Sequence, residues 1–496
     1  MTGGGGEPVG SGNPAPDFPW RRANTHRRTV CVATSPSVMS AAPAFTSVNP
    51  ATETTIATYD AHESEEVEAR LARSVRSFAR QKDRPIEDRA RRMRRVAEVL
   101  QDRAEDIGRL MTREMGKPIN QAQAEAEKCA WVCRYYAEQA ADFLADEEVE
   151  TAAQTSFVAY EPLGPLLAVM PWNYPFWQVF RFAAPALMAG NVVLLKHAPN
   201  TIGCALAIEE VLLEAGFDEG ALQALLVDEE TVADVIADDR VQGVTLTGSV
   251  GAGQAVAKQA AAHVKPTVLE LGGSDPLIVC ADADLDRAAS VGCTARMQNS
   301  GQSCIAAKRF IVERPVLSEF TDRLIEEVEA LAVGDPKKQD TDVGPLARED
   351  LLRDVHNQVE RAIGHGAVAV TGGHTMERAG YYYKPTVLTD VEPGTVAFEE
   401  EIFGPVASIV VADDADHAVE LANATRFGLG ASVFTEDREK GTRMARALDA
   451  GCAFVNQMTK SDPRLPFGGV KESGYGRELS HHGIREFVNA KTIWVE

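Results

Sequence analysis

The sequence predicts an α/β fold with a doubly wound, mostly parallel sheet and, further along the chain, a second α/β unit. Three observations lead to this prediction. The chain has 496 residues, which suffices for about three folding units at ~150 residues each. Uninterrupted apolar runs such as 166–170 and 192–195 are typical of strands buried on both faces of a parallel sheet. Segments with helical spacing separate these runs, as they do in doubly wound sheets.

The first third of the chain contains two different kinds of segment. Residues 1–44 are rich in Gly, Pro, Ser and Thr without a sustained apolar period, so we expect a disordered N-terminal tail. From 64 to 145, apolar residues recur at helical spacing, with Val67 and Leu71 in one run and Met93 in the next. This region is predicted to be a surface layer of helices.

The rest of the chain follows the α/β alternation. The first unit is predicted over 163–275, with helices near 203–215 and 253–263. The second unit is predicted over 276–450, and its strands are expected at 276–280, 308–312 and 407–411. A last strand is expected at 491–495.

Charge and cysteine usage exclude several classes of function. The net charge is −23, from 73 acidic and 50 basic residues, so phosphates would be repelled and a nucleic-acid partner is not expected. The charge fits either an ordinary solvated acidic surface or a protein from a halophilic source. No uncharged apolar run reaches about 18 residues, so no membrane partner is expected. The eight cysteines form no CxxC pair, which predicts a cytoplasmic protein with reduced thiols and no metal site.

Three segments carry candidate catalytic residues. Cys304 lies in the polar segment 298–307, and a thiolate there can capture a carbonyl carbon. Glu270 ends an apolar run before two glycines, where burial would raise its pKa and suit it to activate water. Upstream, Asn173 can donate its neutral amide to a developing oxyanion. The structural alternatives are a cysteine that packs as a small hydrophobe and a salt-bridged edge carboxylate.

With these segments the chain resembles the aldehyde dehydrogenase superfamily. The family motifs occur in family order, from about residue 46 to the C-terminus, as PWNYP, LELGG, GQSC, EEIFGPV and PFGGVKESGYGRE. The segments LLKHAPN, TREMGKPI, EKCAWVCRYYAE and GRELSHHGIREF look most similar to NAD(P)-dependent succinate-semialdehyde dehydrogenases.

The resemblance implies a particular division of the chain. A Rossmann-type NAD(P)-binding domain is expected at 45–144 and 163–275, and a catalytic α/β domain at 276–465. A small oligomerisation segment is expected at 145–162 and 466–496, which would build a homodimer or homotetramer.

A strand, a glycine-rich turn and a helix from Gln254 onward are predicted around 244–254, so that free N–H groups face a pyrophosphate. The spacing is not GxGxxG, and a plain tight turn is the alternative. The resemblance implies the family's GxxxxG variant, with Gly248, Ser249 and Gly253 at the phosphates.

The other cofactor contacts also come from the resemblance. Lys196 would bind the adenosine ribose, although a lysine that extends to solvent is the alternative. NAD-selective members often carry Glu three positions later, where this chain has Pro199, so we expect both NAD and NADP to be used. The remaining cofactor contacts implied are Trp172, Leu271, Glu401 and Phe403.

The implied reaction is the NAD(P)-dependent oxidation of an aldehyde, with succinate semialdehyde favoured, through a thioester on Cys304. A distal carboxylate needs cations or hydroxyls, and the candidates are Arg181, Arg296, Ser461 and Arg464. Some family members place an arginine six positions before the nucleophile, where this chain has Gln298, so the carboxylate-binding residue stays open. The alternatives are another small aldehyde, aliphatic or betaine-type, and a non-catalytic member of the fold.

Overall fold

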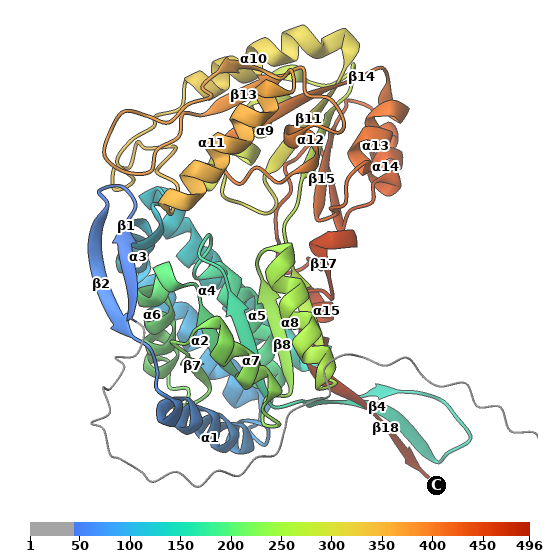
Figure 1. Cartoon of the computed structure of the whole chain (residues 1–496). Helices are drawn as coiled ribbons and strands as arrows, with labels where there is room; N and C mark the ends of the chain where they lie inside the picture. Colours follow the sequence, from blue (N-terminus) through green and yellow to red (C-terminus); the bar gives the residue numbers. More distant parts are fainter. Residues whose placement is uncertain (1–43) are drawn as a thin grey trace, which may run out of the picture. The chain divides into compact units, whose positions relative to one another are not determined.

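Two open sheets, both mostly parallel, organise residues 44–496, which are the residues that this computed structural model describes (Figure 1). The disordered tail expected over 1–44 lies outside the described residues, apart from Ala44. Strand and helix segments alternate along the chain as the sequence predicts, so an α/β fold is confirmed.

The first sheet has the strand order β17-β9-β8-β5-β6-β7. Its strands are β5 (Pro165–Met170), β6 (Val192–His197), β7 (Leu222–Ala224), β8 (Gly243–Thr247), β9 (Thr267–Glu270) and β17 (Gly474–Tyr475). All pair in parallel except β17, which runs antiparallel to β9. Adjacent residues of a strand point to opposite faces of the sheet. Leu166 and Leu167 of β5 belong to two different hydrophobic clusters, which shows that both faces are buried.

Helices cover both faces of this sheet. The cluster that contains Leu166 draws on α2, α4, α5 and α6, and the cluster that contains Leu167 draws on α1, α7 and α8. The helices of this part are α1 (Ser64–Gln81), α2 (Ile86–Asp102), α3 (Ala104–Met115), α4 (Ile119–Phe143), α5 (Trp177–Ala189), α6 (Ile202–Glu214), α7 (Glu229–Ala237) and α8 (Val250–Ala262). The predicted helical layer over 64–145 thus corresponds to α1–α4.

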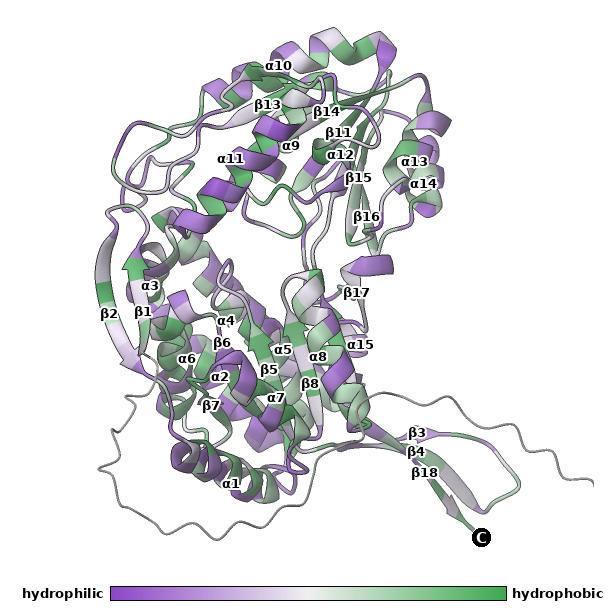
Figure 2. Ribbon diagram, in the orientation of Figure 1, coloured by the Kyte–Doolittle hydropathy of each residue, from purple (hydrophilic) through white to green (hydrophobic). Residues whose placement is uncertain are grey.

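The second sheet has the order β12-β13-β14-β11-β10-β15-β16, with only β12 antiparallel. Its strands are β10 (Asp275–Val279), β11 (Ala307–Glu313), β12 (Val368–Thr371), β13 (Thr386–Thr389), β14 (Val406–Ala412), β15 (Gly430–Phe434) and β16 (Cys452–Val455). Its helices are α9 (Leu285–Met297), α10 (Leu317–Glu329), α11 (Glu349–Gly364), α12 (Val396–Glu399), α13 (Ala415–Asn423) and α14 (Arg438–Ala447). Figure 2 shows the strands of both sheets as largely hydrophobic and the outer helices as alternately hydrophobic and hydrophilic.

A three-stranded antiparallel sheet carries the C-terminus. It consists of β3 (Glu147–Glu148), β4 (Thr155–Pro162) and β18 (Val488–Val495), and β18 pairs with β4 along its whole length. The expectation that all of 466–496 belongs to this segment is wrong, since β17 joins the first sheet and α15 (Ser480–Arg485) packs on α5 and α4. Motif residues before 488 therefore complete the first sheet.

A hairpin at the start of the described chain has no counterpart among the predicted elements. Strands β1 (Ala44–Asn49) and β2 (Thr54–Asp60) form it. Within residues 44–496 none of the helices combines the length and apolarity required to cross a bilayer. Over the same stretch, no group of three His, Cys, Asp or Glu side chains has the arrangement of a metal site.

Candidate active site

Cys304 lies in the connection between α9 and β11, and unusual backbone conformations shape this loop. Asn299 and Ser300 adopt left-handed conformations with φ of 54° and 56°, and Gly301 follows with φ of 73°. A Cβ on Gly301 would lie 2.4 Å from the carbonyl of Gly404, so only glycine fits there. The side-chain amide of Asn299 donates to the Gln302 carbonyl at 3.0 Å, which closes the turn before Cys304.

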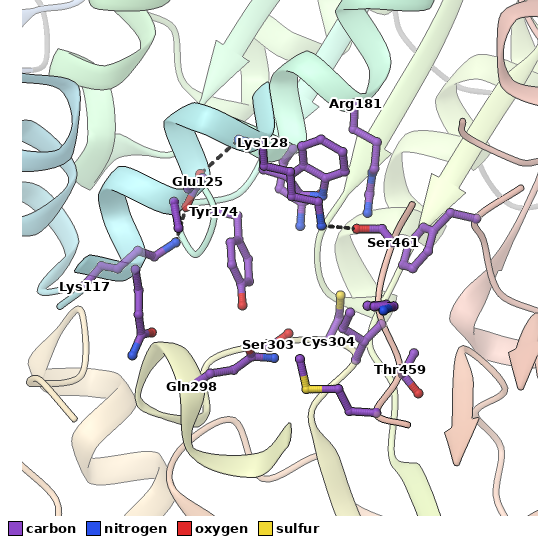
Figure 3. A pocket seen from close by; sticks show the side chains of 18 of the residues that line it. Lys117, Glu125, Lys128, Tyr174, Arg181, Gln298, Ser303, Cys304, Thr459 and Ser461 are labelled. Atoms are coloured by element: carbon purple, nitrogen blue, oxygen red, sulfur yellow. Dashed lines mark hydrogen bonds and ion pairs between the residues drawn. The ribbon is translucent and has the colours of Figure 1, made fainter. Parts of the chain in front are cut away.

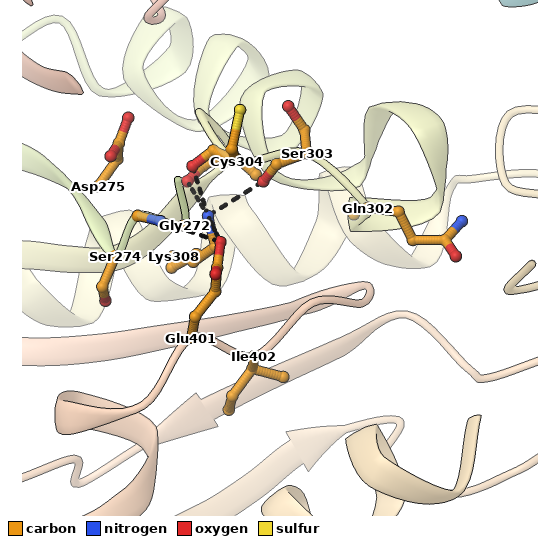
Figure 4. Close-up of polar contacts among 12 residues, drawn as sticks. Gly272, Ser274, Asp275, Gln302, Ser303, Cys304, Lys308, Glu401 and Ile402 are labelled. Atoms are coloured by element: carbon orange, nitrogen blue, oxygen red, sulfur yellow. Dashed lines mark hydrogen bonds and ion pairs between the residues drawn. The ribbon is translucent and has the colours of Figure 1, made fainter. Parts of the chain in front are cut away.

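A buried lysine stabilises the Cys304 loop through hydrogen bonds to its backbone. Lys308 on β11 donates to the backbone carbonyls of Ser303 at 3.0 Å and Cys304 at 2.8 Å (Figure 4). It also pairs with Glu401 at 3.2 Å, and Glu401 accepts from the Gly273 N–H at 3.1 Å. Sequence reasoning missed Lys308, although a lysine at the start of the strand predicted over 308–312 is the available signal.

Asn173 reaches Cys304 from the turn before α5. Its amide donates to the Gln302 carbonyl at 3.2 Å, and its own carbonyl accepts from Asn299 at 2.9 Å. The turn is anchored by the buried Glu125 of α4, which accepts from the N–H groups of Phe176 and Trp177, each at 2.9 Å. An acidic group at these free N–H donors stabilises the helix start and thereby fixes the position of Asn173.

Two cavities meet at Cys304, since its side chain lines both of them. One cavity, of about 390 Å³, has the cofactor candidates Trp172, Gly248, Ser249, Leu271, Glu401 and Phe403 in its wall, together with Asn173, Thr247 and Arg348. The other, of about 340 Å³, is lined by residues of α4 and α5 and by the segment 458–461 (Figure 3). A thiol in this position can react with a molecule in one cavity while a second molecule occupies the other.

The first cavity fits a dinucleotide by the chemistry of its wall. Trp172 and Phe403 pack edge to face, with ring centroids 5.8 Å apart, and supply apolar surface for a planar ring. Ser249 caps α8, whose first turn has no acidic residue. The N–H groups and positive end of α8 are therefore open to phosphate.

The predicted glycine turn is shorter than expected. Helix α8 begins at Val250 because the Ser249 hydroxyl accepts from the Ala252 N–H at 3.3 Å, so the expected helix start at Gln254 is wrong. Gly253 lies inside the helix, where a Cβ would approach the Leu271 side chain at 2.6 Å. Its role in the structure is close packing, and it does not line the cavity.

Lys196 and Pro199 lie at the end of β6, apart from the wall of this cavity. Burial lowers the pKa of Lys196, while the carboxylates of Glu229 and Asp228 act in the opposite direction. Asp228 caps α7 and Glu229 is its first residue. Helix α7 follows β7, and β7 pairs with β6, so the start of α7 lies near the end of β6. No pattern in the sequence indicates that these acids would approach Lys196.

The substrate candidates divide into two pairs. Arg181 and Ser461 line the second cavity, as does Gln298. The expectation for Arg296 is contradicted: its buried guanidinium donates to the carbonyls of Gly301, Ile402, Gly404 and Val406 and supports the loop from behind. Arg464 is exposed and pairs with Asp462 at 2.7 Å, so it also lies outside the cavity wall. Three of the four carbonyls at Arg296 come from long-range packing that spacing does not reveal, whereas the partner of Arg464 lies two positions earlier in the chain.

Glu270, the last residue of β9, is buried and its two carboxylate oxygens accept no hydrogen bond from any residue of 44–496. Burial raises its pKa well above the usual value, Arg181 opposes this rise and Glu478 adds to it. The side chain abuts Gly468 and does not line either cavity. In this conformation Glu270 therefore lies outside the walls of the two cavities at Cys304.

Burial also raises the pKa of Cys304, to about 12, against the lowering influence of Arg181 and Lys308. The thiol is therefore protonated near neutral pH in this arrangement. Forming the thiolate requires a group that accepts the proton or a bound cation nearby.

Comparison with known proteins agrees with this geometry. The model of the aldehyde dehydrogenase family matches residues 38–493. A probable NADP(+) succinate-semialdehyde dehydrogenase of Synechocystis sp. is 54% identical over 452 residues, covering 91% of this chain and 100% of that protein. The NADP(+) succinate-semialdehyde dehydrogenase 1 of Mycobacterium tuberculosis (strain H37Rv) is 51% identical over 451 residues, 90% of this chain and 99% of that protein.

Solved structures show the same fold. The crystal structure of succinic semialdehyde dehydrogenase from Streptococcus pyogenes, in complex with NADP+, superposes with a TM-score of 0.89 at 35% identity, and the match covers 91% of this chain and 99% of that one. The structure of Gox0499 gives a TM-score of 0.90 at 39% identity, covering 91% of this chain and 100% of that one. The chain therefore belongs to the aldehyde dehydrogenase family.

Proposed function

We propose that the protein oxidises succinate semialdehyde to succinate with NADP or NAD. The observation that carries the proposal is the position of Cys304 between a cavity with the features of a dinucleotide site and a second cavity that contains cationic side chains. The names of the relatives support the choice of aldehyde, since those at 51–54% identity are succinate-semialdehyde dehydrogenases.

In the first half of the reaction, the Cys304 thiol loses its proton to solvent water, its sulfur bonds to the aldehyde carbon, and the carbonyl oxygen becomes an oxyanion. The side-chain amide of Asn173 and the Cys304 N–H are the donors we assign to this oxygen. A nicotinamide held beside Trp172 and Phe403 would supply the hydride acceptor. Loss of hydride from the adduct leaves the acyl group on the Cys304 sulfur as a thioester.

In the second half, Glu270 takes a proton from water as the water oxygen attacks the thioester carbon. The C–S bond then breaks and succinate leaves. For this step the Glu270 carboxylate must move from its place beside Gly468 to the cavity that contains Cys304. Burial raises the pKa of Glu270, which strengthens it as a base once it is ionised.

Use of both cofactors follows from the absence of a carboxylate at Pro199. The Streptococcus pyogenes structure was solved with NADP+, and a betaine aldehyde dehydrogenase structure with a TM-score of 0.88 was solved with NAD+. The acids beside Lys196 would repel a 2′-phosphate, so we expect NAD to compete well with NADP here.

Two further features of the protein belong to this proposal. The exposed Trp494 and Val495 on β18 support contact between copies of the chain in a homodimer or homotetramer. The seven cysteines among residues 44–496 are all free, which supports a reducing, cytoplasmic environment.

The test is a substrate panel run with NAD and with NADP, following the absorbance of the reduced cofactor. We expect kcat/KM to be highest for succinate semialdehyde and lower for butyraldehyde. Betaine aldehyde, a cation, should be poor because Lys128 and Arg181 line the cavity. Equal kcat/KM for all three aldehydes would reject the proposed substrate, and no reduction of either cofactor would reject the proposed reaction.

A further inference from the structure

The second cavity holds four cationic side chains, and they differ in how their charge is balanced. Lys117 pairs with the buried Glu125, and Arg181 pairs with the buried Glu478. Lys460 is exposed to solvent. Lys128 has no carboxylate within ion-pair distance among residues 44–496, although it is largely shielded from water.

The partners of Lys128 are neutral. Its ammonium donates to the Ser461 hydroxyl at 2.8 Å and lies 4.3 Å from the centre of the Trp177 ring. The nearest acids on the chain are already engaged. Glu125, one turn earlier on α4, pairs with Lys117 and accepts two backbone N–H groups, and Asp462 pairs with Arg464.

The Lys128 ammonium uses one of its three N–H donors on Ser461 and has no carboxylate partner within residues 44–496. A charged group in this state is destabilising where water is largely excluded. Burial lowers the pKa of Lys128 to about 8, in line with a cation that lacks an anion. An anionic group entering the cavity would restore both the charge balance and the remaining hydrogen bonds.

We propose that Lys128 and Ser461 together bind the distal carboxylate of the substrate and so set the preference for an aldehyde acid. This inference rests on the proposed function. The Ser461 hydroxyl accepts from Lys128 and keeps its own hydrogen for the carboxylate, while Lys128 has two further N–H donors. Figure 3 shows the Lys128–Ser461 pair across the cavity from Ser303 and Gln298, with Cys304 between them on the floor.

The cavity that contains this pair and the sulfur also has apolar walls that suit a short methylene chain. Trp177, Ile305 and Phe467 contribute this apolar surface. Arg181 contributes positive potential, but its ion pair with Glu478 leaves Lys128 as the largely buried cation available to a ligand.

The test compares Lys128→Met with Lys460→Met, which removes a positive charge from an exposed position at the same cavity. The measured quantity is the ratio of kcat/KM for succinate semialdehyde to that for butyraldehyde. We expect this ratio to fall about 30-fold in Lys128→Met, the size expected for one charge-assisted hydrogen bond, and less than about threefold in Lys460→Met. Ser461→Ala should lower it about fivefold.

A binding measurement separates recognition from catalysis. Succinate should bind to Cys304→Ala in calorimetry, and about 30-fold more weakly to the double variant Cys304→Ala with Lys128→Met. Thermal unfolding checks that each variant is folded. If Lys128→Met does not fold, the ratio of kcat/KM for the two aldehydes in Ser461→Ala decides: an unchanged ratio overturns the inference and a lowered ratio supports it.

The outcomes distinguish this inference from the proposed function. If the wild-type enzyme does not prefer succinate semialdehyde over butyraldehyde, the proposed substrate is wrong. If it has that preference and folded Lys128→Met keeps it, the substrate stands and the assignment of Lys128 is wrong. An equal loss of the ratio in Lys460→Met would mean that general positive potential, rather than this pair, selects the carboxylate.

Discussion

Replacing Glu270 with Gln should separate the two halves of the reaction. The change is nearly isosteric, and the Glu270 oxygens accept no hydrogen bond within residues 44–496 and form no ion pair there. We therefore expect the free energy of unfolding to change by less than about 1 kcal/mol below about pH 4.5, where both side chains are uncharged. Removing a general base should slow hydrolysis of the thioester roughly 10²–10⁴-fold, while attack and hydride transfer continue.

The assay is a rapid-mixing experiment with excess aldehyde and oxidised cofactor. Glu270→Gln should release about one equivalent of reduced cofactor per site in a burst, followed by a steady state slowed by the same factor. Intact mass of the quenched protein should show an acyl group at Cys304. A normal steady-state rate, or no burst together with no added mass, would refute the role of Glu270 in deacylation.

Stability against pH gives an independent check on the buried acid. Burial raises the folded-state pKa of Glu270 above its usual 4.5, so the folded protein holds this proton more tightly than the unfolded chain. The stabilisation is complete below about pH 4.5 and is lost as pH rises through the folded-state pKa. The Gln variant has no such proton, so the free energy of unfolding of the variant should rise relative to that of the wild type as pH increases from about 4.5 to the folded-state pKa of Glu270.

Two further substitutions test the loop around Cys304. Gly301→Ala should destabilise the protein by about 1–3 kcal/mol and abolish activity, because a Cβ would lie 2.4 Å from the Gly404 carbonyl at a φ of 73°; a wild-type melting temperature would contradict this. Arg296→Met should lower stability by about 3 kcal/mol or more, since four backbone carbonyls lose a charged donor, and it should affect succinate semialdehyde and butyraldehyde alike. Selective loss of activity with succinate semialdehyde would restore the substrate role that the sequence suggested for Arg296.

The sequence predicted the parts of the site that depend on local patterns. Asn173 and Cys304 could be proposed because each lies in a short motif whose glycines, prolines and polar residues determine a loop. Gly248 and Ser249 could be proposed because strand, turn and helix follow one another in the chain, and the structure brings all four residues to the wall of one cavity. The buried strands were found because both faces of each sheet are covered, which leaves continuous apolar runs.

The parts that were missed depend on contacts between distant segments. Ser461 meets Lys128 across 333 positions of the chain, so no spacing could have paired them. Three of the four backbone carbonyls that accept from Arg296 belong to residues 106–110 positions further along the chain. The sequence alone does not indicate whether a charged side chain contacts water, backbone carbonyls or a ligand. Only the folded structure distinguishes these three environments.

The pH dependence of substrate binding follows from the surroundings of Lys128. Its pKa of about 8 results first from burial, with Arg181 lowering it further and Cys129, Glu125 and Asp462 raising it. Above that pH the Lys128 ammonium of the free enzyme is deprotonated, so KM for succinate semialdehyde should rise about tenfold for each pH unit. KM for butyraldehyde should depend on pH only through ionisable groups that contact both aldehydes.

The matched control is Lys128→Met, in which the difference between the two aldehydes should no longer depend on pH. If the difference in KM between the two aldehydes still depends on pH in this variant, a group other than Lys128 is responsible for that dependence. Arg181 and its partner Glu478 are the nearest alternatives. A bound carboxylate stabilises the protonated lysine, so saturation with succinate should move the apparent pKa of Lys128 upward. That shift is a direct measure of the coupling between the cation and its ligand, since protonation and binding are linked reciprocally.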